Sequence, residues 1–416
     1  MRRHHLIFFF ILTFHVNSFA QKLYTLPQAM QEASNNNIFL KTESYNIGIS
    51  KADITTAALR PNPVLNNQYL QLMNLNYSPS GSSDYLSRTN RQTWFQLTKP
   101  ILLGNLREKR MDVARQNFEL AKYSYNGTVR NLYYDVANKW LDIWLLKNNL
   151  MIFEDAKDNI DTLVQINENR YKNSVITSTE LLRTKLLSDQ YTLQLKTLKQ
   201  QYRNEMQVLK LLTGSGDSID INTTDEIVKI RIPDKIDSLI TIALEKRTVQ
   251  SKALLELSKR NISLQRAASL PYFEGGVLLN PQNSIIYAGT YATLSIPVFN
   301  RNQGEIEKSK VYVQQAETRI SGMEFQIKTE VYNAFNSFQT NKQNLEEFKY
   351  ITQQSLKVLS TVRYSYLKGN TTIIDFIEAQ RSYLDTRKLY YEAAFNLGKS
   401  YIELIYTTGI ISEINN

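Results

Sequence analysis

The sequence contains no cysteine and only three histidines among its 416 residues. Without cysteine, the chain can form no disulfide bond and offers no thiol for attachment of a lipid. The histidines are His4, His5 and His15, all near the N-terminus. Because these two side chains supply most nucleophiles, general bases and transition-metal ligands, we predict neither an enzyme nor a metal site, and no cofactor.

Long apolar runs are missing too, apart from one. Residues 1–20 join a basic start to an apolar stretch at 6–16 and end on Ala20, which is the pattern of a secretory signal peptide. We predict cleavage before Gln21 and export from the cytoplasm. An uncleaved anchor is the alternative, although the stretch is short for the ~20 residues that span a membrane. No later run is long enough for a transmembrane helix, so that only a β-barrel would cross a membrane.

Charge of one sign is not concentrated in any block of the chain. Lys and Arg number 49 and Asp and Glu 39, which gives a formal net charge of +10. The two signs are interspersed along helical stretches, as on solvated helix faces rather than on a stripe that binds nucleic acid. We therefore expect no nucleic-acid partner.

What the sequence does contain is the same plan twice. The segment 94–102 recurs as 291–299, and Thr213-Gly214 recurs as Thr408-Gly409. Because both segments recur in the same order in the second half of the chain, we predict a duplicated, elongated architecture. We expect a first repeat at 21–213, a connecting segment at 214–233, a second repeat at 234–409 and a short tail at 410–416.

Each repeat is predicted to contain a helix, two strands, a long helix and a further helix. The expected helices are 26–59, 104–165, 178–212, 235–268, 304–367 and 372–406, and the expected strands are 64–77, 91–102, 272–279 and 285–299. Prolines just after 59 and 268 end the first helix of each repeat. The two longest helices are amphipathic and would span roughly 90 Å at about 1.5 Å per residue. Such helices must pack against other long helices as coiled-coil pairs.

The predicted fold class is mainly α with four strands per chain. Because the smallest membrane barrels have about eight strands, four strands cannot close one, and two chains would give about 8 strands and three about 12. The alternation of polar and apolar residues in these strands is weak. A soluble periplasmic coiled-coil adaptor or scaffold is therefore the alternative to a membrane channel.

Two junctions in the chain resemble a known family. Residues 295–306, where a strand meets a long helix, and 363–380, around a helix-to-helix turn, are similar to the TolC-like outer-membrane efflux proteins. The resemblance covers the mature chain. The sequence of the strand-to-helix junction and Pro61-Asn62-Pro63 are most similar to the CzcC and CusC branch, which exports heavy-metal cations. Many members of that branch carry a lipidated cysteine after the signal peptide, which this chain lacks.

The resemblance implies a homotrimer in the cell outer membrane. Four strands per chain would form one shared 12-stranded barrel, continued by a long periplasmic α-helical barrel. It further implies an efflux duct that passively conducts heavy-metal cations or drugs from the periplasm to the outside. The implied partners are a periplasmic adaptor (membrane fusion) protein and an inner-membrane pump of the RND type, which together form a tripartite system.

The resemblance also places a gate at the helix-to-helix turns. Asp375 and Glu378 match acidic residues that ring the periplasmic aperture, Tyr366 matches a latch tyrosine, and Glu180 matches the acceptor of that latch. Thr371 stands where the family's latch has an arginine, so no salt bridge can form from this position.

The turns themselves match the places where an adaptor docks. They are represented by Ser174, Val175, Gly369 and Asn370. Gly369 also suits a sharp chain reversal, which is a sufficient reason for a glycine there.

The acidic residues have simpler interpretations as well. Thr177 with Glu180, and Thr372 with Asp375, have the spacing of capping boxes, which start a helix and need no pore. Glu378 shares a helix face with Asp375 and is equally compatible with a solvated surface.

Overall fold

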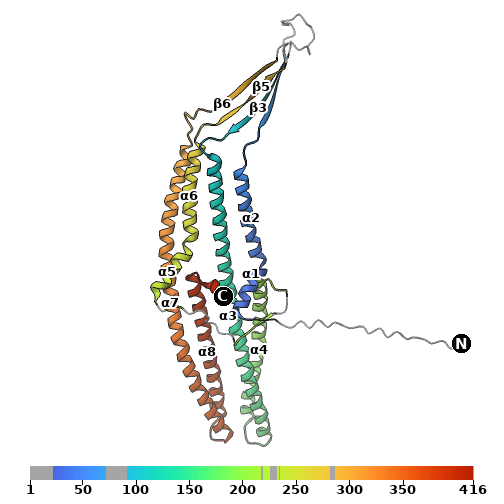
Figure 1. Cartoon of the computed structure of the whole chain (residues 1–416). Helices are drawn as coiled ribbons and strands as arrows, with labels where there is room; N and C mark the ends of the chain where they lie inside the picture. Colours follow the sequence, from blue (N-terminus) through green and yellow to red (C-terminus); the bar gives the residue numbers. More distant parts are fainter. Residues whose placement is uncertain are drawn as a thin grey trace, which may run out of the picture.

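The chain forms one elongated body with a sheet at one end and two helix-to-helix turns at the other (Figure 1). The structure is a computed structural model that describes residues 22–71, 91–216, 219–224, 232–233, 235–281 and 286–415. The signal peptide and the predicted strand residues 72–77 and 285 lie outside this part of the chain. The predicted fold class, mainly α with a four-stranded sheet, is confirmed.

Two helices extend through most of the molecule. Helix α3 contains 67 residues and α7 contains 65. Below the middle of the molecule, α3 pairs with α4 and α7 with α8, and above it α2 and α6 lie beside them. The helices are α1 (Leu26–Asn36), α2 (Ile38–Ala58), α3 (Leu106–Lys172), α4 (Ser178–Thr213), α5 (Ile236–Arg247), α6 (Val249–Ala268), α7 (Gln303–Leu367), α8 (Ile373–Thr407) and the 3-10 helix η2 (Ile411–Asn415). Across the described ranges, no helix has the length and apolarity needed to cross a membrane.

Two of the predicted helices are interrupted. The helix expected at 26–59 breaks at Asn37, whose side chain accepts from Leu40 N at 2.8 Å and donates to Leu212 O at 2.8 Å. The helix expected at 235–268 breaks at Thr248, which is 1% exposed. A contact to a distant helix thus fixes the break at Asn37, the Thr248 hydroxyl donates to Leu244 O at 2.7 Å within its own segment, and neither break contains proline or glycine.

The main sheet is antiparallel throughout, in the order β2-β3-β5-β6. The strands are β2 (Val64–Gln71), β3 (Arg91–Ile101), β5 (Phe273–Asn280) and β6 (Tyr287–Leu294). Strand β6 ends before Ser295, so that 295–299, predicted as strand, form a loop. The two halves of the chain meet between β3 and β5, where a Cβ at Gly276 would lie 2.2 Å from Leu97 O.

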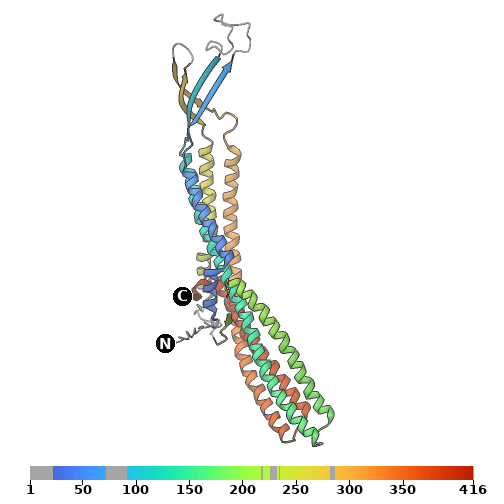
Figure 2. The same cartoon turned by 90° about the vertical axis from the view of Figure 1, so that its right-hand side faces the viewer.

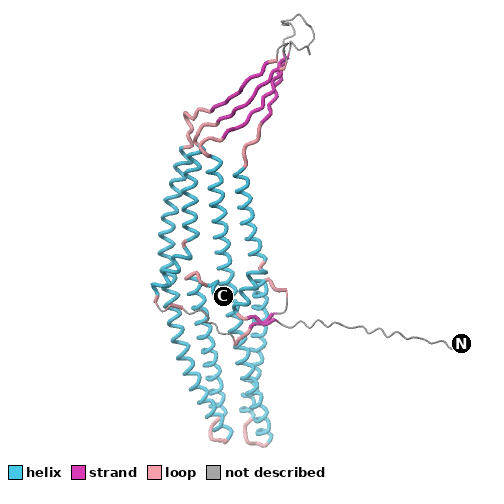
Figure 3. The backbone as a smooth tube through the Cα atoms, viewed as in Figure 1, coloured by secondary structure: helices cyan, strands magenta, loops and turns pink. Residues whose placement is uncertain are grey.

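A small parallel sheet at the middle of the molecule was not predicted. It pairs β1 (Lys22–Tyr24) with β4 (Ile219–Ile221) (Figure 3). Two indoles of α3 hold it in place: Trp140 Nε1 donates to Tyr24 O at 3.1 Å, and Trp144 Nε1 donates to Thr223 O at 3.1 Å. Because strands this short have little stability alone, their pairing depends on these contacts.

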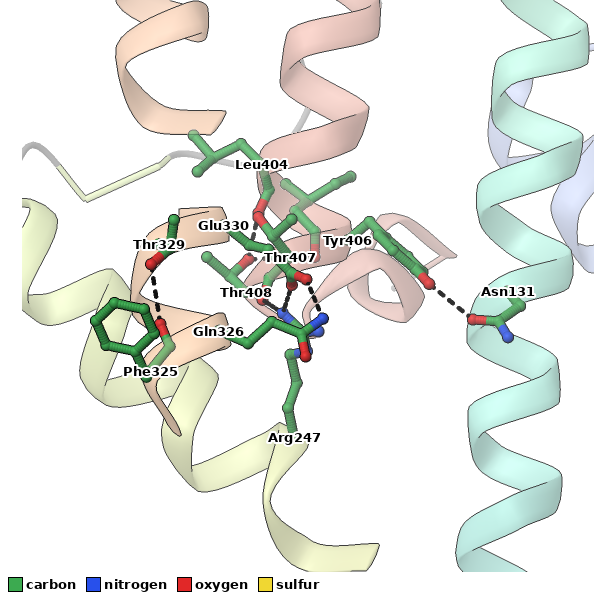
Figure 4. Close-up of polar contacts among 11 residues, drawn as sticks. Asn131, Arg247, Phe325, Gln326, Thr329, Glu330, Leu404, Tyr406, Thr407 and Thr408 are labelled. Atoms are coloured by element: carbon green, nitrogen blue, oxygen red, sulfur yellow. Dashed lines mark hydrogen bonds and ion pairs between the residues drawn. The ribbon is translucent and has the colours of Figure 1, made fainter. Parts of the chain in front are cut away.

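We call this middle region the waist, and it holds the larger of two hydrophobic cores. Helix η2 packs there, with Ile411 completely buried, so the predicted tail contributes Ile410, Ile411 and Ile414 to the core. Arg247, at the end of α5, donates to Glu330 of α7 at 2.6 Å and to Thr407 O of α8 at 3.0 Å (Figure 4). A cation at the C-terminal end of α8 is also favoured by the helix dipole.

The helices below the waist are inclined to those above it (Figure 2). The lower part consists of two helical hairpins, the first formed by α3 and α4 and the second by α7 and α8. A second hydrophobic core joins these hairpins. The waist therefore separates a sheet-bearing half from a half whose free ends are the helix-to-helix turns.

Candidate functional site

The register of the main sheet separates its side chains by chemistry. Residues paired across strands point to the same side. The more apolar face carries Leu65, Tyr69, Phe95, Leu97, Ile101, Phe273, Val277, Leu279 and Leu294, with Asn67, Gln71, Arg91, Thr93, Lys99 and Thr290 among them. The polar face carries Asn66, Gln68, Gln92, Gln96, Thr98, Glu274, Asn280, Tyr287, Tyr291 and Thr293, with Val64, Leu70, Trp94 and Leu278 among them.

The apolar face is open in the single chain. Leu65 is 70% exposed, Val277 58% and Leu97 48%. An exposed apolar surface of this extent is expected to contact another apolar surface, whereas the polar side chains of the opposite face can be hydrated by water. Such a division is what a sheet between lipid and an aqueous lumen needs.

One charged side chain lies on the polar face of the described strands. Glu274 accepts a hydrogen bond from Thr98 Oγ1 and one from Tyr272 Oη, the latter at 3.0 Å. The bond from Thr98 joins β3 to β5 at the end of the sheet nearest the helices, and the bond from Tyr272 is local. Apart from this carboxylate, the polar face is lined by amides, hydroxyls and aromatic rings, with the aliphatic side chains of Val64, Leu70 and Leu278 among them.

The outer edges of the sheet are free within the described residues. Strands β2 and β6 each pair with one neighbour only. Unpaired edge groups in a membrane are costly, so that both edges need another strand.

The two turns at the other end have one geometry. Ser174 and Gly369 both adopt positive φ, 56° and 80°. Val175 N donates to Arg170 O at 2.8 Å, and Asn370 N donates to Ser365 O at 2.9 Å, which is the closing bond of a Schellman motif. Ser174, Val175, Gly369 and Asn370 are all exposed at the tips, where a partner could reach them.

Both predicted capping boxes are present. Glu180 N donates to Thr177 Oγ1 at 3.3 Å, and the Glu180 carboxylate accepts from Thr177 N at 2.7 Å. The bonds between Thr372 and Asp375 are equivalent, at 3.2 and 3.1 Å. Each acid therefore starts a helix, as the simpler interpretation predicted.

Asp375 has a further partner. Thr371, in the place of the expected latch arginine, donates its hydroxyl to Asp375 at 2.7 Å. Hydrogen bonds from Thr372 and Thr371 lower the pKa of Asp375. Glu378 is exposed, one turn further along α8, so that both acids present carboxylates to water beside the turn.

Tyr366 joins the two hairpins. Its ring is 4% exposed and stacks on Phe376 at 5.6 Å, and its hydroxyl donates to Asn167 of α3 at 2.8 Å. The guanidinium of Arg170 lies 5.0 Å from the same ring and donates to Leu367 O at 3.2 Å.

The structure thus gives Tyr366 a different partner from the expected one. Tyr366 contacts Asn167 on α3, while Glu180 on α4 is engaged in its own cap. Sequence reasoning missed Asn167. The available signal was its position: it continues the apolar series of Ile160 and Leu163 as a polar residue, and it is completely buried.

These features define a class of protein: a mostly helical, elongated subunit that carries a sheet with one apolar and one polar face. The particular family follows from comparison. The model of the family "Outer membrane efflux protein" matches residues 31–215 and 243–409, and the chain belongs to this family. No curated protein sequence matches the chain.

Solved structures show the same fold. CusC is 16% identical, with 95% of each chain covered and a TM-score of 0.75. The outer membrane protein VceC from Vibrio cholerae is 15% identical, with 92% of this chain and 96% of that chain covered and a TM-score of 0.72. The open state of the Neisseria gonorrhoeae MtrE outer membrane channel is 14% identical, with 93% and 89% covered and a TM-score of 0.73.

The localisation and general function follow from the family. The protein is an efflux channel protein of the cell outer membrane. The family is one of channels and not of enzymes.

Proposed function

We propose that three copies of this chain assemble into one efflux duct. Each copy supplies four strands to a shared 12-stranded barrel, and the long helices continue the duct into the periplasm. The apolar face of the sheet contacts lipid and the polar face lines the lumen. We also infer that the two repeats, 21–213 and 234–409, are the duplicated unit, because the same order of helices and strands occurs in both.

The observation that carries this proposal is the sheet itself. Among the described residues its two outer edges are free, and side chains such as Leu65 and Val277 are exposed on its apolar face. A soluble coiled-coil scaffold would leave this face in water, which is unfavourable by about 25 cal/mol per Å² of apolar surface. Joining the free edges of neighbouring copies inside a bilayer removes both difficulties.

We propose that the turns at 173–177 and 368–372 dock a periplasmic adaptor, which couples the duct to an inner-membrane pump of the RND type. Val175 is 67% exposed at one tip, and exposed apolar side chains at a loop tip suit a protein partner. The cargo is proposed to be heavy-metal cations or drugs, with selection made by the pump.

The gate is proposed to lie just above these turns. Asp375 and Glu378 would place six carboxylates around the threefold axis and favour cations at a constriction. Tyr366 would hold the closed arrangement through Asn167 and Arg170, in place of the latch to Glu180.

The decisive experiment is the native mass of the complex extracted by detergent from the outer-membrane fraction. We expect a mass of three chains per particle, and we expect that particle to form pores in a planar lipid bilayer. A monomer or dimer that leaves the membrane with salt alone would overturn the shared barrel.

A further inference from the structure

The loops that join the sheet to the helices lie at one level of the molecule (Figure 3). They are the segments 59–63, 102–105, 269–272 and 295–302. We call these segments, together with Lys99 near the end of β3 and the last turn of α6 at 265–268, the collar. The collar lies where the apolar face of the sheet ends and the helices begin.

The collar contains four cations and no acidic residue. The cations are Lys99, Arg60, Arg266 and Arg301. All four are exposed, and none forms an ion pair with any described residue. Lys99 lies on the apolar face of the sheet, where it pairs with Gly275 between rows of apolar side chains.

The acidic residues next to the collar do not neutralise these cations. Glu274 lies on the opposite face of the sheet from Lys99. Glu305 is paired with Lys308 at 3.5 Å, and Glu108 directly follows another arginine, Arg107, in the first turn of α3. A second copy of the chain would bring the same excess of positive charge. The counter-charge must therefore come from another kind of molecule.

The collar also exposes large apolar side chains. Phe299 is 93% exposed, Ile296 77% and Leu59 65%. Exposed apolar side chains next to unpaired cations are typical of segments that lie in the head-group region of a membrane. A small anion in water would neutralise the cations but would leave these apolar side chains in water.

A second cation on the apolar face marks the other border of the same surface. Arg91 lies on the same face of β3 as Lys99 and eight residues before it, which is about 27 Å along a strand at ~3.4 Å per residue. On a tilted strand this separation is close to the ~25 Å height of the apolar band of a membrane barrel. A charge on the lipid-facing side of a strand is tolerated at the borders of that band and not at its middle. Lys99 therefore fits the level of the head groups next to the helices.

We propose that the collar binds the phosphate groups of anionic phospholipids in the leaflet next to the helices. The ammonium and guanidinium groups donate charge-assisted hydrogen bonds to phosphate oxygens. Phe299 and Ile296 lie among the upper parts of the acyl chains. This inference rests on the proposed function, because it requires the apolar face of the sheet to contact lipid.

The test uses the full-length complex reconstituted in phosphatidylcholine vesicles that contain a trace of spin-labelled phosphatidylglycerol or spin-labelled phosphatidylcholine. Electron paramagnetic resonance distinguishes lipid held at the protein surface from free lipid. At low ionic strength we expect phosphatidylglycerol to be favoured about fivefold at this surface, the effect of about one cation next to a phosphate. The preference should weaken in about 1 M salt, where the Debye length is about 3 Å.

Two pairs of substitutions separate the collar from the overall charge. Arg60→Gln together with Arg301→Gln should reduce the preference by roughly twofold or more. Lys196→Gln together with Arg203→Gln is the matched control, because both residues are exposed on α4, away from the sheet. This control should behave as the wild type does.

A conservative pair keeps the test valid if the glutamine pair misfolds. Arg301 Nε also donates to Pro297 O at 3.1 Å, so its replacement can disturb the loop. Arg60→Lys together with Arg301→Lys keeps both charges and should keep the preference for phosphatidylglycerol. Loss of the preference in this pair would mean that the loop conformation, and not the charge, determines lipid binding, and would overturn the proposal.

Three other results would also overturn the lipid site. They are equal binding of the two lipids, a preference that survives in the folded glutamine pair, and displacement of phosphatidylglycerol by inorganic phosphate at constant ionic strength, which would indicate a site for free anions. The native mass of the same preparation tests the proposed function separately. Three chains per particle without a lipid preference would contradict the collar alone, whereas a monomer would contradict the duct.

Discussion

At the scale of single residues, Tyr366 has the clearest expected effect. Tyr366→Phe removes the hydroxyl that links α7 to Asn167 and leaves the ring stacked on Phe376. One buried hydrogen bond contributes about 0.5–1.5 kcal/mol, so the closed arrangement should lose population by roughly 2- to 10-fold. Single-channel recording should show a matching rise in leak. Tyr364→Phe is the control, because Tyr364 is 65% exposed; equal leak in both variants would remove Tyr366 from the gate.

The acids beside the turn allow a second prediction. Asp375→Ala together with Glu378→Ala should raise conductance and weaken block by multivalent cations, because the carboxylates would no longer line a constriction. Asp375→Ala also removes a helix cap, at a cost of about 1 kcal/mol. Glu180→Ala removes the equivalent cap of α4 and serves as the comparison. If conductance and block match those of the wild type, the acids are caps alone.

Asp220 at the waist should make stability depend on pH. Burial alone would raise its pKa, but Lys147, Tyr202 and the Ile221 N–H together lower it. A carboxyl whose pKa is lower in the folded state stabilises the fold above the unfolded value of about 3.9 and loses that contribution as pH falls through the folded pKa.

Asp220→Asn should therefore lower the free energy of unfolding by about 1–3 kcal/mol at neutral pH. The difference from the wild type should shrink as the pH falls below about 3.9. Thermal unfolding followed between neutral and acid pH measures this, with the exposed Asp189→Asn as reference. A difference that persists at the acid end would mean that the Asp220 contribution is not electrostatic.

Local residue patterns could be predicted and long-range ones could not. The caps at Thr177 and Thr372 follow from residues three positions apart in the sequence, and both formed. The bond between Tyr366 and Asn167 joins residues 199 positions apart. Sequence spacing gives no information about such a pair, and only the packing of α3 against the second hairpin determines it.

At the scale of elements, Gly276 shows how tightly β3 and β5 pack. A Cβ there would lie 2.2 Å from Leu97 O, whereas a Cβ at Gly289 has no neighbour within 4 Å. Gly276→Ala should thus destabilise the sheet by about 1–3 kcal/mol, and Gly289→Ala should change stability by less than about 0.5 kcal/mol. Heating of the extracted complex, followed by circular dichroism, compares the two. Equal melting would mean that β3 and β5 separate easily.

The type of each long helix and strand could be predicted from the sequence, whereas the residues at which the helices begin, break and end could be predicted less well. Periodicity identified α3 and α7, although α3 continues to Lys172, beyond the predicted end at 165. The break at Asn37 was not predicted, because its hydrogen bond to Leu212 O comes from a distant helix. Strands β1 and β4 are three residues each, too short for any alternation to be visible.

At the scale of the whole molecule, the two faces of the sheet predict where a charge is tolerated. Leu97 and Gln96 are neighbours on β3 but point to opposite faces. Leu97→Arg would place a charge against lipid, at about 2–4 kcal/mol near the middle of the bilayer. Gln96→Arg would place the same charge in the lumen.

The amount of each variant in the outer-membrane fraction measures this difference. Leu97→Arg should be depleted there, and Gln96→Arg should reach the level of the wild type. Equal amounts of the two variants would contradict the assignment of the faces. The sequence alone could not predict this outcome, because exceptions such as Lys99 and Leu278 obscure the alternation until the register aligns the strands.

The waist brings the first and last described helices into one core. Helix α1 and helix η2 contact each other there, and Met30 and Ile411 are both completely buried. A polypeptide that enters the periplasm from its N-terminus can form its helical hairpins early, since those contacts are local. It cannot close the waist until residues 411–415 have arrived. Folding of the middle of the molecule therefore waits for these residues, and a chain interrupted before them would expose an unfinished core to periplasmic proteases.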